Sequence, residues 1–276
     1  MRFYLLLIVA VVGISSCATS GVDLDPGGPF TREELERRVA QLERRAERRP
    51  NDADTWYALG NAYFDGDAFN EARQAYRRVV ELDESRADAW SNLGLTHRIQ
   101  GNFMNAVSAY ETALQLEPDD AVTLRNLSIL MQDLGHLEAS TGPLQRLLQL
   151  DPSDASIRNE LAHVFVLVGR YDDALHIWED GGDALPTEIH HDIARATALL
   201  RTGRLDEAGA VLVNAEARDS SHPMLPPARA DYYRRMGEFE AAWREVDRCQ
   251  RRGIPLDPDF VALLRAETDN RTGAIR

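Results

Sequence analysis

The chain has 276 residues, of which 44% are hydrophobic, so it can bury a substantial apolar core. Its formal net charge is -14, and all 31 basic residues are arginine. This acidic balance argues against binding to duplex nucleic acid, whose phosphates require a concentrated basic surface. Ala, Leu, Glu and Arg are abundant, and Val, Ile and Thr form no alternating runs, so the composition predicts an all-α fold.

The N-terminus combines a basic residue, an apolar run and a cysteine. Arg2 precedes the run 3–14, which is too short to span a bilayer in the usual way but suits the hydrophobic region of a secretory signal. The run ends in Ile14-Ser15-Ser16-Cys17, which resembles the lipobox of bacterial lipoproteins. The resemblance implies that residues 1–16 are a signal peptide and that Cys17 is acylated as a membrane anchor. The alternative is an ordinary signal peptide whose cleavage site lies near Cys17.

The residues after the cysteine bear on localisation. Ala18 and Thr19 follow it, and neither is the Asp that retains many enterobacterial lipoproteins at the inner membrane. The resemblance therefore implies a lipoprotein of the bacterial outer membrane that faces the periplasm. Residues 17–30 contain several Gly and Pro residues and little apolar content, so they are predicted to form a flexible tether.

A 34-residue repeat follows the tether. Trp56-x-x-Leu59-Gly60-x-x-Tyr63 resembles the signature of the tetratricopeptide repeat (TPR) family, and its pattern returns as Trp90, Leu93, Gly94 and His97. Small residues recur at the middle of each predicted first helix, at Gly60, Gly94, Ser128, Ala162, Ala196 and Ala230. They also recur in each predicted second helix, at Ala72, Ala106, Ser140, Ala174, Ala208 and Ala242. Short side chains at these positions allow paired helices to approach closely.

These columns predict six helix-turn-helix repeats, at 53–86, 87–120, 121–154, 155–188, 189–222 and 223–256. Residues 31–50 and 257–276 are predicted to add terminal capping helices, because an end repeat would otherwise expose its stacking face. The TPR resemblance implies a right-handed superhelical solenoid. Gly142-Pro143 predicts a kink or late start in one helix, and Gly181-Gly182 predicts a shortened one. Pro223 and the prolines after it predict a delayed helix in the last repeat.

No enzyme motif interrupts this pattern, so we expect a chain that is not an enzyme and has no cofactor. His190-His191, flanked by Glu188 and Asp192, comes nearest to a metal site. Adjacent side chains on a helix point about 100° apart, which favours solvated histidines and no metal site. Cys249 lies in an apolar column and is expected to be a buried core residue.

The TPR resemblance implies a concave groove lined by the first helix of each repeat. The predicted partner-binding residues are Tyr57, Asn61, Phe64, Ser91, Arg98, Arg125, Gln132, Asn159 and His163. Asn61 and Asn92 stand where chaperone-binding TPR domains place the asparagines of a carboxylate clamp. Tyr57 replaces the lysine which that clamp requires, so a structural role for both asparagines is favoured. Asn, Arg, His and aromatic side chains together favour an extended peptide over lipid or nucleic acid.

Six such repeats behind a lipobox also resemble the pilotin-type lipoproteins of type IV pili, which help a secretin ring assemble in the outer membrane. The resemblance implies a membrane-anchored scaffold that binds a protein or peptide partner, such as a secretin, and supports assembly of an envelope complex. The alternative is a non-catalytic accessory subunit of an envelope enzyme, such as a protease or cell-wall synthase. A cytosolic co-chaperone is disfavoured by the signal sequence.

Overall fold

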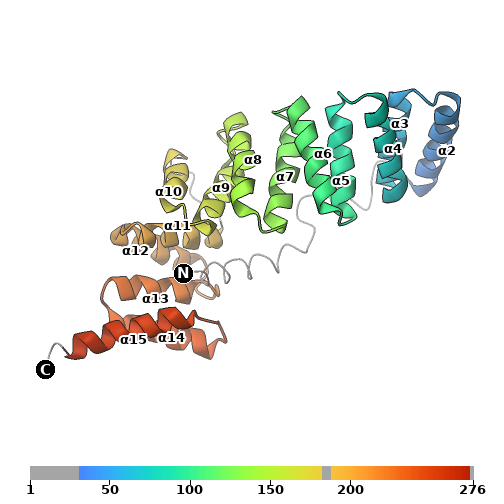
Figure 1. Cartoon of the computed structure of the whole chain (residues 1–276). Coiled ribbons are helices and arrows are strands. Elements are labelled where there is room, and N and C mark those ends of the chain that lie inside the picture. The colour runs from blue at the N-terminus through green and yellow to red at the C-terminus, as the bar shows by residue number, and fades with distance from the viewer. Residues whose placement is uncertain (1–30, 182–187, 274–276) are drawn as a thin grey trace. The chain divides into compact units, whose positions relative to one another are not determined.

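The structure is a computed structural model of the chain, and it describes residues 31–181 and 188–273. All regular elements within these residues are α-helices (Figure 1), and they divide into two compact units, which meet between Asp151 and Pro152. In the described part of the chain, no helix is both long enough and apolar enough to cross a membrane. Cys17, the predicted signal peptide and the whole of the predicted tether lie outside the described residues.

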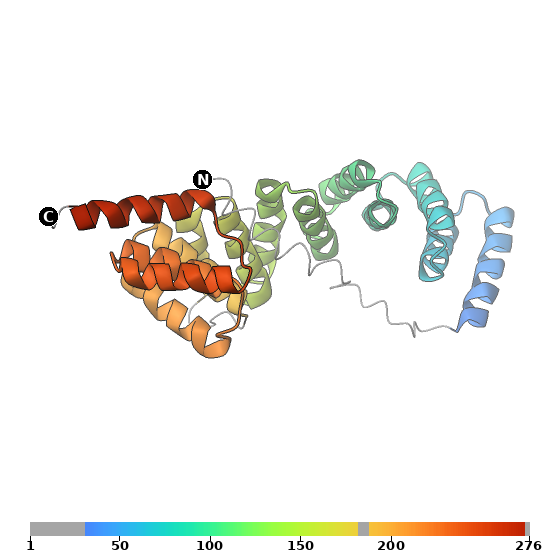
Figure 2. The ribbon, with the colours of Figure 1, turned by 90° about the horizontal axis from the view of Figure 1, so that it is seen from below.

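The N-terminal unit is a row of helices in which each packs against the next (Figures 1 and 2). Its helices are α2 (Arg32–Arg48), α3 (Ala53–Asp65), α4 (Phe69–Leu82), α5 (Ala87–Ile99), α6 (Phe103–Leu116), α7 (Ala121–Asp133) and α8 (Leu137–Leu150). Three hairpins, α3–α4, α5–α6 and α7–α8, follow α2, which packs on the first of them. Thr31 caps the start of α2, because its hydroxyl accepts from the Glu34 amide while the Glu34 carboxylate accepts from the Thr31 amide.

The C-terminal unit continues the hairpin pattern. Its helices are α9 (Ala155–Leu167), α10 (Tyr171–Asp180), α11 (Ile189–Arg201), α12 (Leu205–Arg218), α13 (Leu225–Arg235), α14 (Phe239–Arg251) and α15 (Pro258–Gly273). Phe260 and Leu264 of α15 are buried against Ala230 and Val246, so the last helix covers the end of the final hairpin. Cys249 is a free and fully buried cysteine of the core, as expected.

Small residues hold each hairpin together at the predicted positions. The second-helix column, Ala72, Ala106, Ser140, Ala174, Ala208 and Ala242, is completely inaccessible to solvent. In the first helices the small residue faces a large one. A Cβ atom added at Gly60 would lie 2.6 Å from the Tyr76 ring, and one added at Gly94 would lie 2.7 Å from the Tyr110 ring. The first two hairpins therefore need glycine because a tyrosine ring occupies the space of a Cβ atom.

The turn inside each hairpin uses the left-handed backbone conformation. In five hairpins the residue is a glycine, with φ between 72° and 82°: Gly101, Gly135, Gly169, Gly203 and Gly237. The first hairpin has Asp67 at the same position, with φ of 56°. Aspartate tolerates this region better than most residues with a side chain, so the turn keeps its shape.

The irregular segments depart from the regular repeat in different ways. α10 ends at Asp180 and has 10 residues, against 14 in α4, α6, α8 and α12, so the prediction of a shortened helix before Gly182 is confirmed. α13 begins at Leu225, which confirms the predicted delay. Of the two outcomes predicted for Gly142-Pro143, a kink or a late start, the late start is excluded, because α8 begins at Leu137 and continues through the proline.

Arg229, which stands where the repeat has leucine, is explained by its ion pairs. It contacts Glu216 of α12 and Glu245 of α14, the latter with an N–O distance of 3.1 Å. One guanidinium thereby connects three helices of the C-terminal unit. Nothing in the structure explains the arginine at position 195, whose Nε has no hydrogen-bond partner among the described residues.

The substitution Gly94→Ala tests the contact between the small column and the tyrosine rings. The new methyl group would overlap the Tyr110 ring, so we expect a loss of about 1–3 kcal/mol in the free energy of unfolding. Gly142→Ala in α8 is the matched control, because a Cβ atom there meets nothing within 4 Å. Urea unfolding followed by circular dichroism measures both, and equal losses in the two variants would contradict this packing.

Candidate functional site

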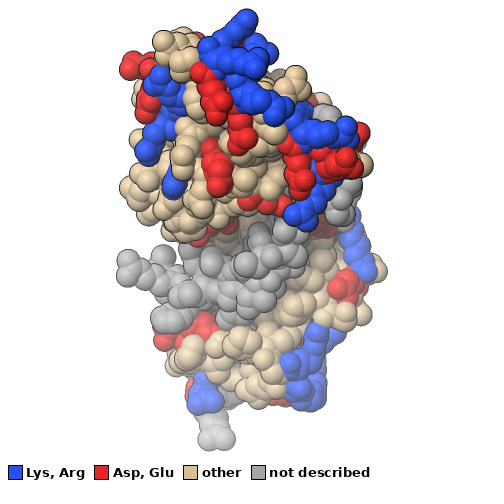
Figure 3. Space-filling model, turned by 90° about the vertical axis from the view of Figure 1, so that its right-hand side faces the viewer, with Lys and Arg blue, Asp and Glu red and all other residues tan. Residues whose placement is uncertain are grey.

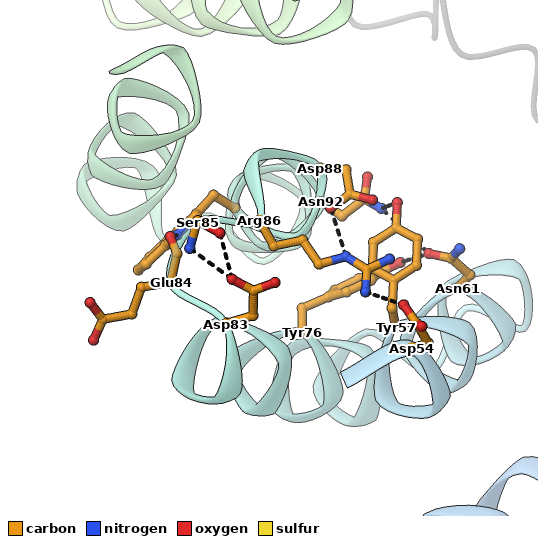
Figure 4. Close-up of polar contacts among 11 residues, drawn as sticks. Asp54, Tyr57, Asn61, Tyr76, Asp83, Glu84, Ser85, Arg86, Asp88 and Asn92 are labelled. Atoms are coloured by element: carbon orange, nitrogen blue, oxygen red, sulfur yellow. Dashed lines mark hydrogen bonds and ion pairs between the residues drawn. The ribbon is translucent and has the colours of Figure 1, made fainter. Parts of the chain in front are cut away.

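Most of the predicted binding residues lie on the face formed by α3, α5 and α7 of the N-terminal unit, which we call the first-helix face. Tyr57 of α3 is the centre of a polar network there (Figure 4). The Asn92 side-chain amide donates to the Tyr57 hydroxyl at 3.1 Å and to Asn61 Oδ1 at 3.4 Å. The structure therefore brings Tyr57 and Asn61 together and joins them to α5.

Arg86, immediately before α5, completes this network. Its guanidinium carbon lies 4.4 Å from the centre of the Tyr57 ring, which is a cation–π contact. Its nitrogens pair with Asp54 at 2.5 Å and with Asp88 at 3.1 Å. Burial, followed by the nearby Asp88 carboxylate, raises the pKa of the Tyr57 phenol above its usual value. Tyr57 is thus a neutral hydrogen-bonding group held between an arginine and two asparagines.

Asn61 has a structural role. Its Oδ1 accepts from the Tyr76 hydroxyl at 2.8 Å as well as from Asn92, so the carboxamide ties the first hairpin to the second. The side chains that face Asn61 and Asn92 here are tyrosines. The favoured interpretation of these asparagines, structural rather than part of a carboxylate clamp, agrees with these contacts.

The remaining predicted residues of this unit differ in accessibility. Arg125 is exposed on α7, and Gln132 is half-buried on the same helix. Arg98 pairs with Asp133 at 3.2 Å and so joins α5 to α7. Phe64 packs edge-on against Phe69 within its own hairpin, with ring centres 5.4 Å apart.

Two predicted binding residues are buried instead of presented to a partner. Ser91 is 7% exposed and its hydroxyl accepts from Thr123 at 2.6 Å. Asn159 is also 7% exposed, and its Oδ1 accepts from the Trp178 indole at 3.1 Å. Each side chain is used by a neighbouring helix, so these two expectations need correction. His163, like Asn159, belongs to the C-terminal unit, where its ring lies beside His190 and His191.

Arg86, Asp54 and Asp88 are site residues that the sequence prediction did not include. Asp54 and Asp88 lie three residues before Tyr57 and Ser91, which are predicted groove residues, and side chains three apart share a helix face, so the signal was available. On the face drawn in Figure 3, arginine and acidic side chains of the described residues are interspersed.

Sequence comparisons identify the repeats that build this face. A family profile described as "Tetratricopeptide repeat" matches residues 87–120, and one described as "TPR repeat" matches residues 60–98. The chain contains tetratricopeptide repeats. No curated protein matches it in sequence.

Solved TPR structures share the fold at low sequence identity. YrrB, described as a TPR protein with an unusual peptide-binding site, has a TM-score of 0.59 and 18% identity, over 68% of this chain and 96% of its own. A tetratricopeptide repeat protein from Parabacteroides merdae has a TM-score of 0.55 and 16% identity, over 80% and 86% of the two chains. PilF from Pseudomonas aeruginosa has a TM-score of 0.50 and 17% identity, over 70% and 88%. At these identities the likeness shows the fold alone.

Two tyrosines at equivalent positions of consecutive TPR hairpins provide a matched test of the Asn61 contact. Tyr76 donates to Asn61, whereas Leu95 stands 34 residues after Asn61, and the buried Tyr110 hydroxyl has no hydrogen-bond partner among the described residues. Tyr76→Phe should therefore lower the free energy of unfolding by about 0.5–1.5 kcal/mol.

Tyr110→Phe removes an unpaired hydroxyl, so its unfolding free energy should stay the same or rise slightly. Thermal and urea unfolding of the two variants under identical conditions give the comparison. If Tyr110→Phe lowered the free energy of unfolding as much as Tyr76→Phe or more, the expected contribution of the hydrogen bond to Asn61 would be contradicted.

Proposed function

We propose that this TPR protein is a non-catalytic adaptor that binds an extended peptide segment of a partner protein on the first-helix face. The observation that carries the proposal is the fixed network of Tyr57, Arg86, Asn61 and Asn92. A TPR scaffold serves protein–protein interaction, and this network gives the first-helix face aromatic, guanidinium and carboxamide groups at fixed positions.

The network is held in place before a partner arrives. Arg86 is restrained by two carboxylates and an aromatic ring, and Asn92 is restrained by two acceptors. Side chains that are already ordered lose less conformational entropy on binding, which favours affinity. Tyrosine and arginine are also the residue types that most often dominate interface energetics.

Exposed charges around the network suit peptide termini and side chains. The Asp54 side chain is 82% exposed although it pairs with Arg86, and Arg125 is exposed on α7. A peptide lying along the first-helix face would therefore meet a carboxylate at one position and a guanidinium at another. The peptide-binding site named for YrrB is a precedent in a protein of similar fold.

Site-specific photocrosslinking tests this surface directly. A photoreactive amino acid in place of Arg125 should give a covalent adduct with the partner in intact cells, because this exposed position lies on the proposed face. The matched control is Glu111, which is also exposed but lies on the second helix α6. An adduct formed from Glu111 and not from Arg125 would place the partner on the second helices and so contradict the proposal. Mass spectrometry of the adduct identifies the partner.

The same adaptor is proposed to work at the bacterial outer membrane, anchored through acylated Cys17 and facing the periplasm. The lipobox-like sequence supports this localisation, and the repeat array suits a pilotin-like part in assembling a secretin or another envelope complex. Several acyl chains, at about 0.8 kcal/mol for each buried CH₂ group, would anchor a protein stably.

Cys17→Ser should move the protein from the membrane fraction to the soluble fraction while leaving its helical circular dichroism unchanged. The reason is that serine at this position offers no thiol for acylation. Metabolic labelling with a fatty acid measures the modification, and fractionation measures the location. Equal labelling of wild type and variant would exclude Cys17 as the lipidated residue.

A further inference from the structure

Three histidines meet in the C-terminal unit. His163 comes from α9, whereas His190 and His191 lie in the first turn of α11. The His163 ring centre lies 5.9 Å from that of His190 and 6.0 Å from that of His191, and the last two are 3.9 Å apart. Glu188, the residue before α11, places its carboxylate 3.2 Å from His190 Nδ1.

Adjacent side chains diverge by about 100° around a helix, and for this reason the sequence predicts no shared ion at His190 and His191. In the structure, however, both rings approach the ring of His163 at nearly equal distances. Side-chain length overcomes the divergence at the backbone. The third imidazole comes from α9, which packs against α11, and no local sequence pattern indicates it.

The buried nitrogens of this cluster lack hydrogen bonds. Both ring nitrogens of His163 and Nδ1 of His191 are inaccessible to solvent and have no partner among the described residues. A neutral imidazole carries one N–H donor and one lone pair, and leaving either unmatched in the interior costs about 1–3 kcal/mol. Native interiors satisfy nearly all such groups, so three unmatched nitrogens in one place indicate a ligand that the described part of the chain does not supply.

The protonation state of the cluster suits a cation. Burial, reinforced by His190, lowers the pKa of His163 to about 4. Burial, followed by His190 and His163, lowers the pKa of His191 to about 3. Both rings are therefore neutral at pH 7, which is the state in which imidazole can donate a lone pair to a metal.

We propose that His163, His190 and His191, together with the Glu188 carboxylate, bind a divalent transition-metal ion, for which zinc is the best fit. Imidazole ligands favour zinc, copper and nickel over calcium and magnesium, which prefer oxygen. Ligand atoms of Glu188, His190 and His191 already lie within 4.8 Å of one another. Zinc ligands at about 2.0–2.2 Å in tetrahedral geometry lie about 3.3 Å apart, so these three side chains need only a small adjustment. The His163 ring, whose centre lies 5.9 and 6.0 Å from the other two ring centres, must move toward them to complete the site.

Neighbouring polar groups define the limits of the site. Asp192 is buried next to His191, but its carboxylate pairs with Arg218 at 2.8 Å and is occupied. The ion would connect α9 directly to the start of α11, on either side of the short helix α10 in sequence. The metal would therefore stabilise the fourth and fifth hairpins, independently of what the first-helix face binds.

Zinc titration of the full chain, purified without a polyhistidine tag, tests the site. Isothermal titration calorimetry with ZnCl₂ should show one tight site for each chain, and zinc should raise the melting temperature, because a ligand that binds only the folded state stabilises it. His163→Gln and His190→Gln should each weaken zinc binding by about tenfold or more. His190 is half-exposed, so His190→Gln should fold normally. Its zinc affinity therefore still tests the site if His163→Gln, at a buried position, fails to fold.

His176→Gln is the matched control, because His176 lies in α10 of the same unit and its exposed side chain faces Asp180 at 3.4 Å. Its zinc affinity should stay within about twofold of wild type, since surface histidines make no convergent site. The proposal is overturned if wild type binds no zinc under these conditions. It is equally overturned if His176→Gln loses as much affinity as the two cluster variants, or if the cluster variants bind as wild type does.

Discussion

The close approach of two helices at a small residue is the contact on which each hairpin depends. At Gly60 and Gly94 a tyrosine ring fills the volume that a Cβ atom would occupy, and in the later hairpins a fully buried Ser or Ala stands at this position. Close packing of this kind leaves little freedom in how the two helices cross. The packing of each first helix on its second helix therefore fixes the positions from which the first-helix side chains extend.

This contact also fixes the positions of polar side chains on the first-helix face. Tyr76 packs its ring on Gly60 and extends its hydroxyl to Asn61, so one residue forms both the core of the first hairpin and the support of its surface. Asn61 then positions Asn92 of the next hairpin, and the Asn92 side-chain amide donates to the Tyr57 hydroxyl. A preorganised binding surface of this kind needs supporting hydrogen bonds behind the residues that meet a partner.

The helices were predictable because their signal is repeated. Five first helices begin at residues that the 34-residue columns mark, and left-handed glycines follow five of the six first helices at intervals of 34 residues. The surface was less predictable. Position within a repeat gives the direction in which a side chain leaves its helix, but not which side chains it contacts. The repeat pattern therefore did not indicate that Asn159 accepts a hydrogen bond from Trp178, or that Ser91 accepts one from Thr123. His163 meets two histidines from a later helix, a convergence that depends on tertiary packing alone.

Arg86, which pairs with Asp54 and Asp88 from consecutive hairpins, belongs to a chain whose basic side chains are all guanidinium groups. A guanidinium can bind two carboxylates in a fixed planar geometry, which the compact ammonium of lysine cannot do. It also keeps its proton at any alkalinity that a cell experiences. These cross-helix pairs therefore resist base and lose strength only in acid. Because no side chain carries a primary amine, reagents and enzymes that modify the lysine side chain find no target anywhere in the sequence.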